Sequence, residues 1–168
     1  MTKSISLILG ATVVSMVAGC STTPMVLGTV GPSPASATAQ ADQGYLKVHT
    51  ATEDPGDGGE PNYYPHTSYS IYTESGSLWK SILNHVGTMD ESPMLVRLPI
   101  GRYKVVGKAD GYGQVAVPVI IKPGRVTEVN LEILGRAKPA VVDEAAVVQL
   151  PNGCVVGWRA ELAEDSKK

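Results

Sequence analysis

Strict alternation of apolar and polar residues in the stretch RVTEVNLEIL, residues 125–134, is the feature that most constrains the fold. Val129, Leu131 and Ile133 occupy every second position, and acidic or amide side chains stand between them. Successive side chains of a β-strand point to opposite faces of a sheet. The pattern therefore predicts a strand with one buried face and one polar face.

Further short strands are predicted at near-regular spacing between loops rich in glycine and proline. The 168 residues include 18 glycines and 12 prolines, and no helical period separates the strand-like segments. Such a series of short strands is typical of a β-sandwich. We therefore predict an all-β sandwich over residues 44–134. Its strands are expected within residues 44–52, 67–73, 77–86, 93–109 (two strands), 113–121 and 125–134.

The Asp110-Gly111 pair raises a question of register between two of these strands. Tyr103 and Val105 are expected to face the core together with the alternating valines of GQVAVPVII. A two-residue hairpin would place these two sets on opposite faces of the sheet. The sequence therefore predicts a loop with an odd number of residues or a crossover between sheets.

Two segments, LPIGRYKV and GYGQVAVPVIIKPGRVTEVNLEI, resemble the carboxypeptidase regulatory-like domain family, which has a prealbumin-like (transthyretin-like) β-sandwich. In that family a Leu-Pro-x-Gly-x-Tyr turn enters a core strand, and a Gly-Tyr pair follows in the next corner. The resemblance covers residues 44–134 and implies binding or scaffolding rather than catalysis. At this turn Gly101 can adopt a backbone conformation closed to other residues, and Tyr103 can bury its ring. The insert at residues 53–66 departs from the tight hairpin common in the family.

The first twenty residues, MTKSISLILGATVVSMVAGC, carry one positive charge followed by an uncharged apolar run. This run is shorter than the roughly 20 residues of a membrane-spanning helix and fits a cleaved export signal. A buried N-terminal helix is the alternative, but the apolar residues do not form one stripe. The ending Val17-Ala18-Gly19-Cys20 resembles the lipobox of bacterial lipoproteins. That resemblance implies a signal peptide at residues 1–19, cleavage before Cys20 and acylation of Cys20.

The resemblance also implies a location in the cell envelope. A mature lipoprotein of this kind carries up to three acyl chains, and two or more chains anchor a protein stably. Residue 21 is Ser rather than the Asp that retains many such proteins at the inner membrane, so we expect the outer membrane. Residues 20–43 are expected to be the lipidated cysteine and a flexible linker, because they are rich in small and polar residues.

A C-terminal hairpin and a charged tail are predicted within residues 135–168. Asn152-Gly153 lies between two apolar runs, which is a strong hairpin signal. A two-residue loop would pair Val147 with Trp158 and Leu150 with Val155. The hairpin is expected either to add two strands to a sheet edge or to cover that edge.

The sequence predicts no catalytic residue, no metal site and no cofactor. His49, His66 and His85 lie far apart without metal-ligand spacing. Cys154 is the remaining cysteine once Cys20 is lipidated; a small buried hydrophobic role is favoured over a nucleophile or a dimer bridge. Basic residues are scattered and the net charge is −2, which argues against nucleic-acid binding.

The acidic loop before residue 66 is expected to be solvated, and calcium binding is the alternative. Its carboxylates could gather around calcium, although they lack the ligand spacing of an EF-hand loop. These carboxylates are Glu53, Asp54, Asp57 and Glu60.

An aromatic cluster is the remaining candidate for a binding site. Three interpretations stay open: core packing, a platform for glycan or peptidoglycan, and a protein interface. The sequence thus favours a non-enzymatic structural or protein-interaction module on a lipid anchor, with a glycan-binding module as the alternative. The cluster consists of Tyr63, Tyr64, Tyr69, Tyr72 and Trp79.

Overall fold

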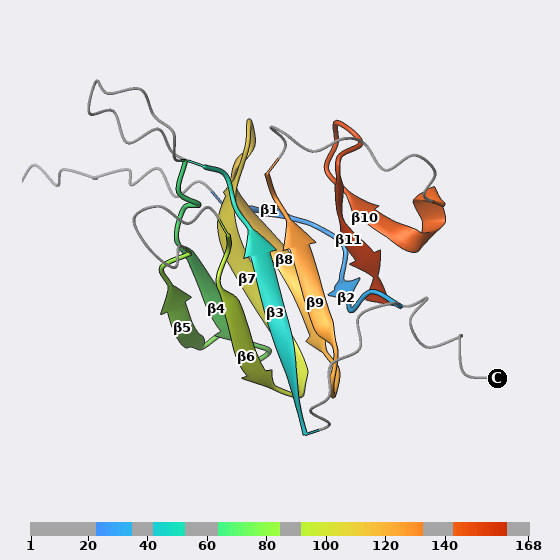
Figure 1. Ribbon diagram of the computed structural model, residues 1–168. Helices are drawn as coiled ribbons and strands as arrows, with labels where there is room; N and C mark the ends of the chain where they lie inside the picture. The colour runs from blue at the N-terminus through green and yellow to red at the C-terminus, as the bar shows by residue number, and fades with distance from the viewer. Residues whose placement is uncertain (1–22, 35–41, 53–63, 85–91, 133–142, 161–168) are drawn as a thin grey trace, which may run out of the picture.

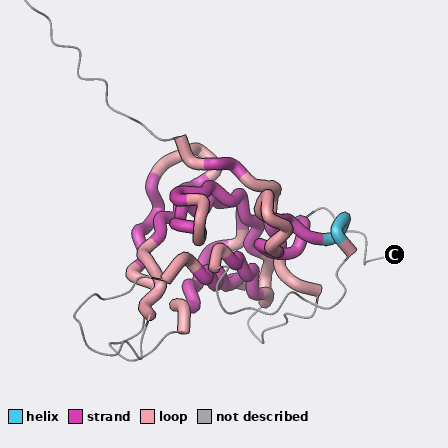
Figure 2. Tube along the Cα trace, turned by 90° about the horizontal axis from the view of Figure 1, so that it is seen from above, coloured by secondary structure: helices cyan, strands magenta, loops and turns pink. Residues whose placement is uncertain are grey.

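The computed structural model describes residues 23–34, 42–52, 64–84, 92–132 and 143–160, and these residues form two packed β-sheets. Figure 1 shows the smaller sheet in front of the larger one, and Figure 2 shows the two layers from above. The one helical element of the described ranges is a 3-10 turn at Glu144–Ala146. Within these ranges, a helix of the length and apolarity required to cross a membrane does not occur. The predicted all-β sandwich is confirmed.

The larger sheet has eight strands in the order β10-β11-β2-β8-β7-β4-β5, with β1 also paired to β8. The smaller sheet has the order β6-β3-β9. The strands of the larger sheet are β1 Met25–Val26, β2 Val30–Gly31, β4 Tyr69–Thr73, β5 Leu78–Ile82, β7 Gly101–Ala109, β8 Gly113–Ile121, β10 Val147–Gln149 and β11 Val155–Arg159. Those of the smaller sheet are β3 Gln43–His49, β6 Leu95–Pro99 and β9 Val126–Asn130.

The hydrophobic core lies between the two sheets and follows the predicted alternation. Leu46, Val48 and Leu98 of the smaller sheet are fully buried, as are Ile71 and Val105 of the larger sheet. These side chains belong to one core cluster. The period-two pattern therefore identified these inward-facing residues correctly.

The corner between β7 and β8 is a three-residue loop. Ala109 pairs with Gly113, so Asp110, Gly111 and Tyr112 connect the strands. This odd number of residues lets Val105 pair with Val117 on the core face, as the register requires. The predicted wider corner is confirmed.

Tyr103 is only partly buried, so the prediction that its ring belongs to the buried core is wrong. It lies opposite Thr73, the last residue of β4, and its ring is partly exposed there. Its hydroxyl donates a hydrogen bond to the Pro99 carbonyl at 3.2 Å, and partial burial raises the pKa of Tyr103. Gly101 has φ +157°, in line with the backbone freedom expected there.

Part of the predicted linker belongs to the sandwich. β1 and β2 lie within residues 20–43, and β2 pairs with β11 on one side and β8 on the other. Val30 is fully buried in the core. The linker prediction is therefore wrong for residues 23–34, because two short strands complete a sheet whose other members come from far along the chain. Residues 1–22, including Cys20, lie outside the described residues.

The C-terminal hairpin adds two strands to the edge of the larger sheet. Val147 pairs with Trp158 as predicted, but Val155 pairs with Gln149 rather than Leu150 because the register shifts at a bulge. Leu150 donates its N–H to the Cys154 carbonyl and accepts one from Gly153. The loop thus has three residues and ends at Gly153, whose φ is +82°.

Candidate functional site

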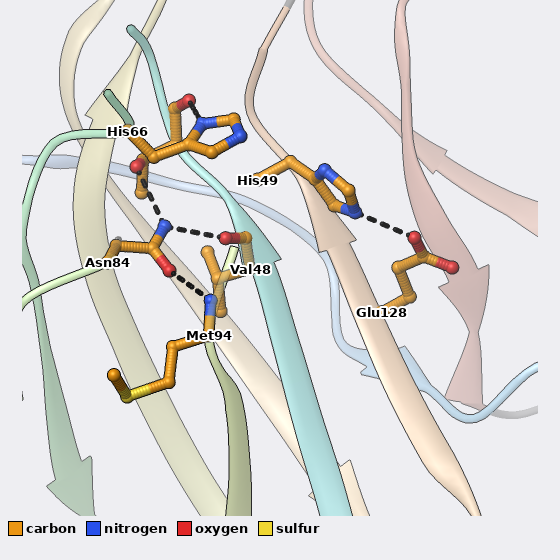
Figure 3. Close-up of polar contacts among 7 residues, drawn as sticks. Val48, His49, His66, Asn84, Met94 and Glu128 are labelled. Atoms are coloured by element: carbon orange, nitrogen blue, oxygen red, sulfur yellow. Dashed lines mark hydrogen bonds and ion pairs between the residues drawn. The ribbon is translucent and has the colours of Figure 1, made fainter. Parts of the chain in front are cut away.

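Two histidines meet at one end of the smaller sheet. His49 ends β3, and His66 lies just before β4, where it forms a bridge with Thr52. Their ring centroids are 5.7 Å apart and the ring planes are nearly perpendicular, at 84° (Figure 3). Both are buried, with 5% of His49 and 6% of His66 exposed. Sequence spacing did not predict this cluster.

The His66 ring is held by a backbone carbonyl. Its Nδ1 lies 2.6 Å from the Thr50 carbonyl oxygen, in a buried contact. A carbonyl oxygen only accepts hydrogen bonds, so Nδ1 must carry the proton. The lone pair of the neutral His66 ring therefore resides on Nε2.

The His49 ring is held by a carboxylate. Its Nε2 lies 2.8 Å from Oε1 of Glu128, which comes from the neighbouring strand β9 and is about half exposed. The carboxylate accepts, so Nε2 carries the proton and the lone pair of a neutral ring lies on Nδ1. Figure 3 shows His66 and Glu128 on opposite sides of the His49 ring.

Glu132 completes a group of three ligand-type side chains. One ring nitrogen of each histidine and one carboxylate oxygen of Glu132 all lie within 4.8 Å of one another. Glu132 follows β9, and the neighbouring Leu131 N–H donates to the His49 carbonyl at 2.6 Å. This backbone bond holds the end of β9 against the end of β3. His85 lies outside the described residues.

Asn84 braces the same end of the sandwich. It is completely buried, and its Nδ2 donates to the Val48 carbonyl at 2.7 Å and to Thr50 Oγ1 at 3.1 Å. Its Oδ1 accepts the Met94 N–H at 3.1 Å (Figure 3). One side chain after β5 thus ties the larger sheet to β3 and to the segment that enters β6.

The aromatic residues of the predicted cluster do not share one surface. Tyr69 is buried in the core, and this burial raises its pKa. Tyr72 lies on the opposite face of β4 with the Lys104 ammonium 5.2 Å from its ring centroid. Trp79 instead packs edge-on against Tyr103 at 6.4 Å. Tyr64 is exposed in the loop before β4, and Tyr63 lies outside the described residues.

Among the described members of the cluster, core packing is therefore the outcome for Tyr69 alone, and these residues do not form a single stacking platform. The acidic side chains considered for calcium, at residues 53–60, also lie outside the described residues.

Strand β5 is an exposed edge with an unusual share of large apolar side chains. It ends the larger sheet, and four of its five residues are exposed. Leu78 is 56% exposed, and Trp79 is also exposed. Leu83, directly after the strand, is exposed as well. An edge strand presents unpaired backbone groups, so β5 combines backbone hydrogen-bonding capacity with apolar contact area.

The remaining surface features give less indication of a binding site. A depression of about 210 Å³ beside the β4–β5 turn is lined by Glu74, Arg102 and Lys104 among others, so charges of both signs border it. Cys154 is half-buried and packs against the core, which fits the predicted role of a small hydrophobic residue.

Comparison with known proteins gives no relative for this chain. No family model, no curated protein and no solved structure matches it. The likeness to the carboxypeptidase regulatory-like domain family and to the lipobox of bacterial lipoproteins therefore stays a prediction from the segments quoted above.

Proposed function

We propose that this chain is a lipid-anchored protein of the bacterial cell envelope, in the outer membrane, whose sandwich binds a partner protein without catalysing a reaction. The observation that carries the binding role is the exposed edge strand β5. A partner segment in extended conformation would add a strand to this edge. Its main chain would pair with β5, and its apolar side chains would contact Leu78 and Leu83.

The charge on β5 favours a different protein over a second copy of this chain. Lys80 is the central residue of β5 and its one charged residue. Antiparallel pairing of two copies about the strand centre would place Lys80 opposite Lys80, and like charges in that position destabilise a strand pair. We therefore expect a partner segment with an acidic residue opposite Lys80. The separation of the aromatic side chains gives a glycan platform no comparable support.

Substitution at the β5 edge tests this binding role. A photo-crosslinking residue at position 79 is expected to capture one envelope protein, which is then purified. Replacing Leu78 with lysine should weaken its binding at least about tenfold, since an apolar contact is lost and a charged side chain takes its place. Affinity is measured by calorimetry. Val26→Lys is the matched control, because Val26 is 67% exposed on the distant strand β1.

Equal weakening by Leu78→Lys and Val26→Lys would contradict a binding surface at β5. Crosslinks formed only between copies of this chain would show self-association instead.

The anchor is tested separately at Cys20. Replacing Cys20 with serine removes the thiol that would carry the lipid, so an uncut precursor without acyl chains is expected. Labelling with a fatty acid and mass spectrometry of the N-terminus measure both effects. Cys154→Ser is the matched control and should leave processing unchanged. Fatty-acid label that persists in the Cys20→Ser chain would contradict lipidation at Cys20.

A further inference from the structure

We propose that His49, His66 and Glu132 bind a divalent transition-metal ion of the class that prefers imidazole nitrogen, with Zn²⁺ as its representative. One ligand atom from each side chain lies within 4.8 Å of the other two. Ligand atoms bonded to one tetrahedral zinc ion at 2.0–2.1 Å lie about 3.4 Å apart. Small rotations of three side chains close this difference.

The donor set suits such an ion. Two histidines and one glutamate form a known set of protein ligands for zinc, and the same combination serves other transition metals. Calcium and magnesium prefer oxygen ligands, so two imidazoles disfavour them. The carboxylates of Glu132 and Glu128 also supply two negative charges near a divalent cation.

The histidine rings are already oriented in the manner of metal ligands. A ligating histidine almost always donates its second ring N–H to a carbonyl or a carboxylate. His66 donates from Nδ1 to the Thr50 carbonyl, and His49 donates from Nε2 to Glu128. Thr50 is itself held, since its Oγ1 donates to the Thr67 carbonyl at 2.6 Å. These contacts define which ring nitrogen of each histidine carries the proton.

Two residues adjacent to the histidines, one along the chain and one across the sheet, have a buried side-chain oxygen without a hydrogen-bond partner. Three buried side-chain oxygens of the described residues have no hydrogen-bond partner, and two belong to Thr67 and Asn130. Thr67 follows His66 in the chain, and Asn130 is the Cα partner of His49 across the β3–β9 pair. Buried polar atoms without partners are rare because they cost stability.

A metal ion here would join three segments that are distant in sequence. His49 ends β3, Glu132 follows β9, and His66 leads into β4 of the other sheet. Binding to the folded state alone would therefore stabilise the sandwich. This inference rests on the histidine cluster and is independent of the partner proposed for β5.

Zinc titration of the full chain tests the site. The protein is purified, dialysed against a chelator and titrated with ZnSO₄ by calorimetry, and with CoCl₂ for its visible absorption spectrum. We expect one ion per chain. Zinc at about 100 times its dissociation constant should raise the unfolding midpoint by about 5 °C or more.

Substitutions of carboxylates near the site, with one distant control, test where the ion binds. Glu132→Gln keeps the side-chain volume but removes the anionic ligand, so zinc affinity should fall more than about 10-fold. Glu128→Ala removes the partner of His49 and should cost about 10- to 100-fold. Glu74→Gln, an exposed carboxylate on the β4–β5 turn, is the matched control and should bind zinc like the original chain.

His66→Gln is expected to abolish the cobalt spectrum. If that variant fails to fold, Glu132→Gln decides, because Glu132 is only half-buried and its replacement keeps the same shape. Absence of zinc and cobalt binding by the original chain would overturn the proposal. Equal affinity of the original chain and Glu132→Gln would overturn it as well.

Discussion

A chain that begins at residue 35 is expected to be at least about 3 kcal/mol less stable than one that begins at residue 21. The shorter chain lacks β1 and β2, and with them the fully buried side chain of Val30. Burying a valine contributes about 1.5–3 kcal/mol, and the backbone hydrogen bonds of a strand add to this. β2 also lies between β11 and β8, so its loss separates the C-terminal hairpin from the sheet.

Urea unfolding of the two chains measures this difference, and two valines of the same segment provide a matched pair. Val30→Ala should cost about 2 kcal/mol, since Val30 is fully buried. Val26→Ala should cost less than about 0.5 kcal/mol, since Val26 is exposed. Equal stability of the two chains would mean that residues 23–34 are the linker that their composition predicts.

Replacing Asn84 with alanine is expected to destabilise the protein by about 3 kcal/mol. The substitution removes the partners of the Val48 carbonyl and the Met94 N–H at a completely buried position. Each buried group left without a partner costs about 1–3 kcal/mol. The same side chain links the ends of both sheets, so its loss should also loosen the Thr50 carbonyl that holds His66.

Chemical denaturation measures the effect of Asn84→Ala, and Asn152→Ala is its matched control. Asn152 is exposed in the β10–β11 loop and accepts one hydrogen bond, from the Cys154 N–H. Its replacement should cost less than about 1.5 kcal/mol, because water can satisfy the group that it leaves. Similar losses in the two variants would contradict a bracing role for Asn84.

The strands between residues 43 and 130 could be predicted from the sequence because side-chain alternation is a local property. Leu46, Val48 and Val129 are apolar at every second position, and the structure buries all three. The odd number of residues in the β7–β8 loop was predictable for the same reason, since two alternating segments must present their valines to one core.

The N-terminal strands and the hairpin register depended on contacts that no local pattern encodes. β1 and β2 are two residues long and exist as strands because β8 and β11 lie beside them. The bulge near Gln149 shifted the C-terminal pairing by one residue. Tyr103 lies opposite the last residue of β4, and the sequence does not tell where that neighbouring strand ends.

The sequence by itself determined that this chain forms a sandwich and that Leu46, Val48, Val105 and Val129 face its core, because alternation requires only neighbouring residues. Only the tertiary structure decided which of the candidate side chains lie together. It placed Tyr69 in the core and gave Tyr72 and Trp79 separate neighbours, Lys104 and Tyr103, although the sequence places the three close together. It also brought His49, His66 and Glu132 together from three segments, because strand pairing joins positions whose separation along the chain carries no ligand spacing.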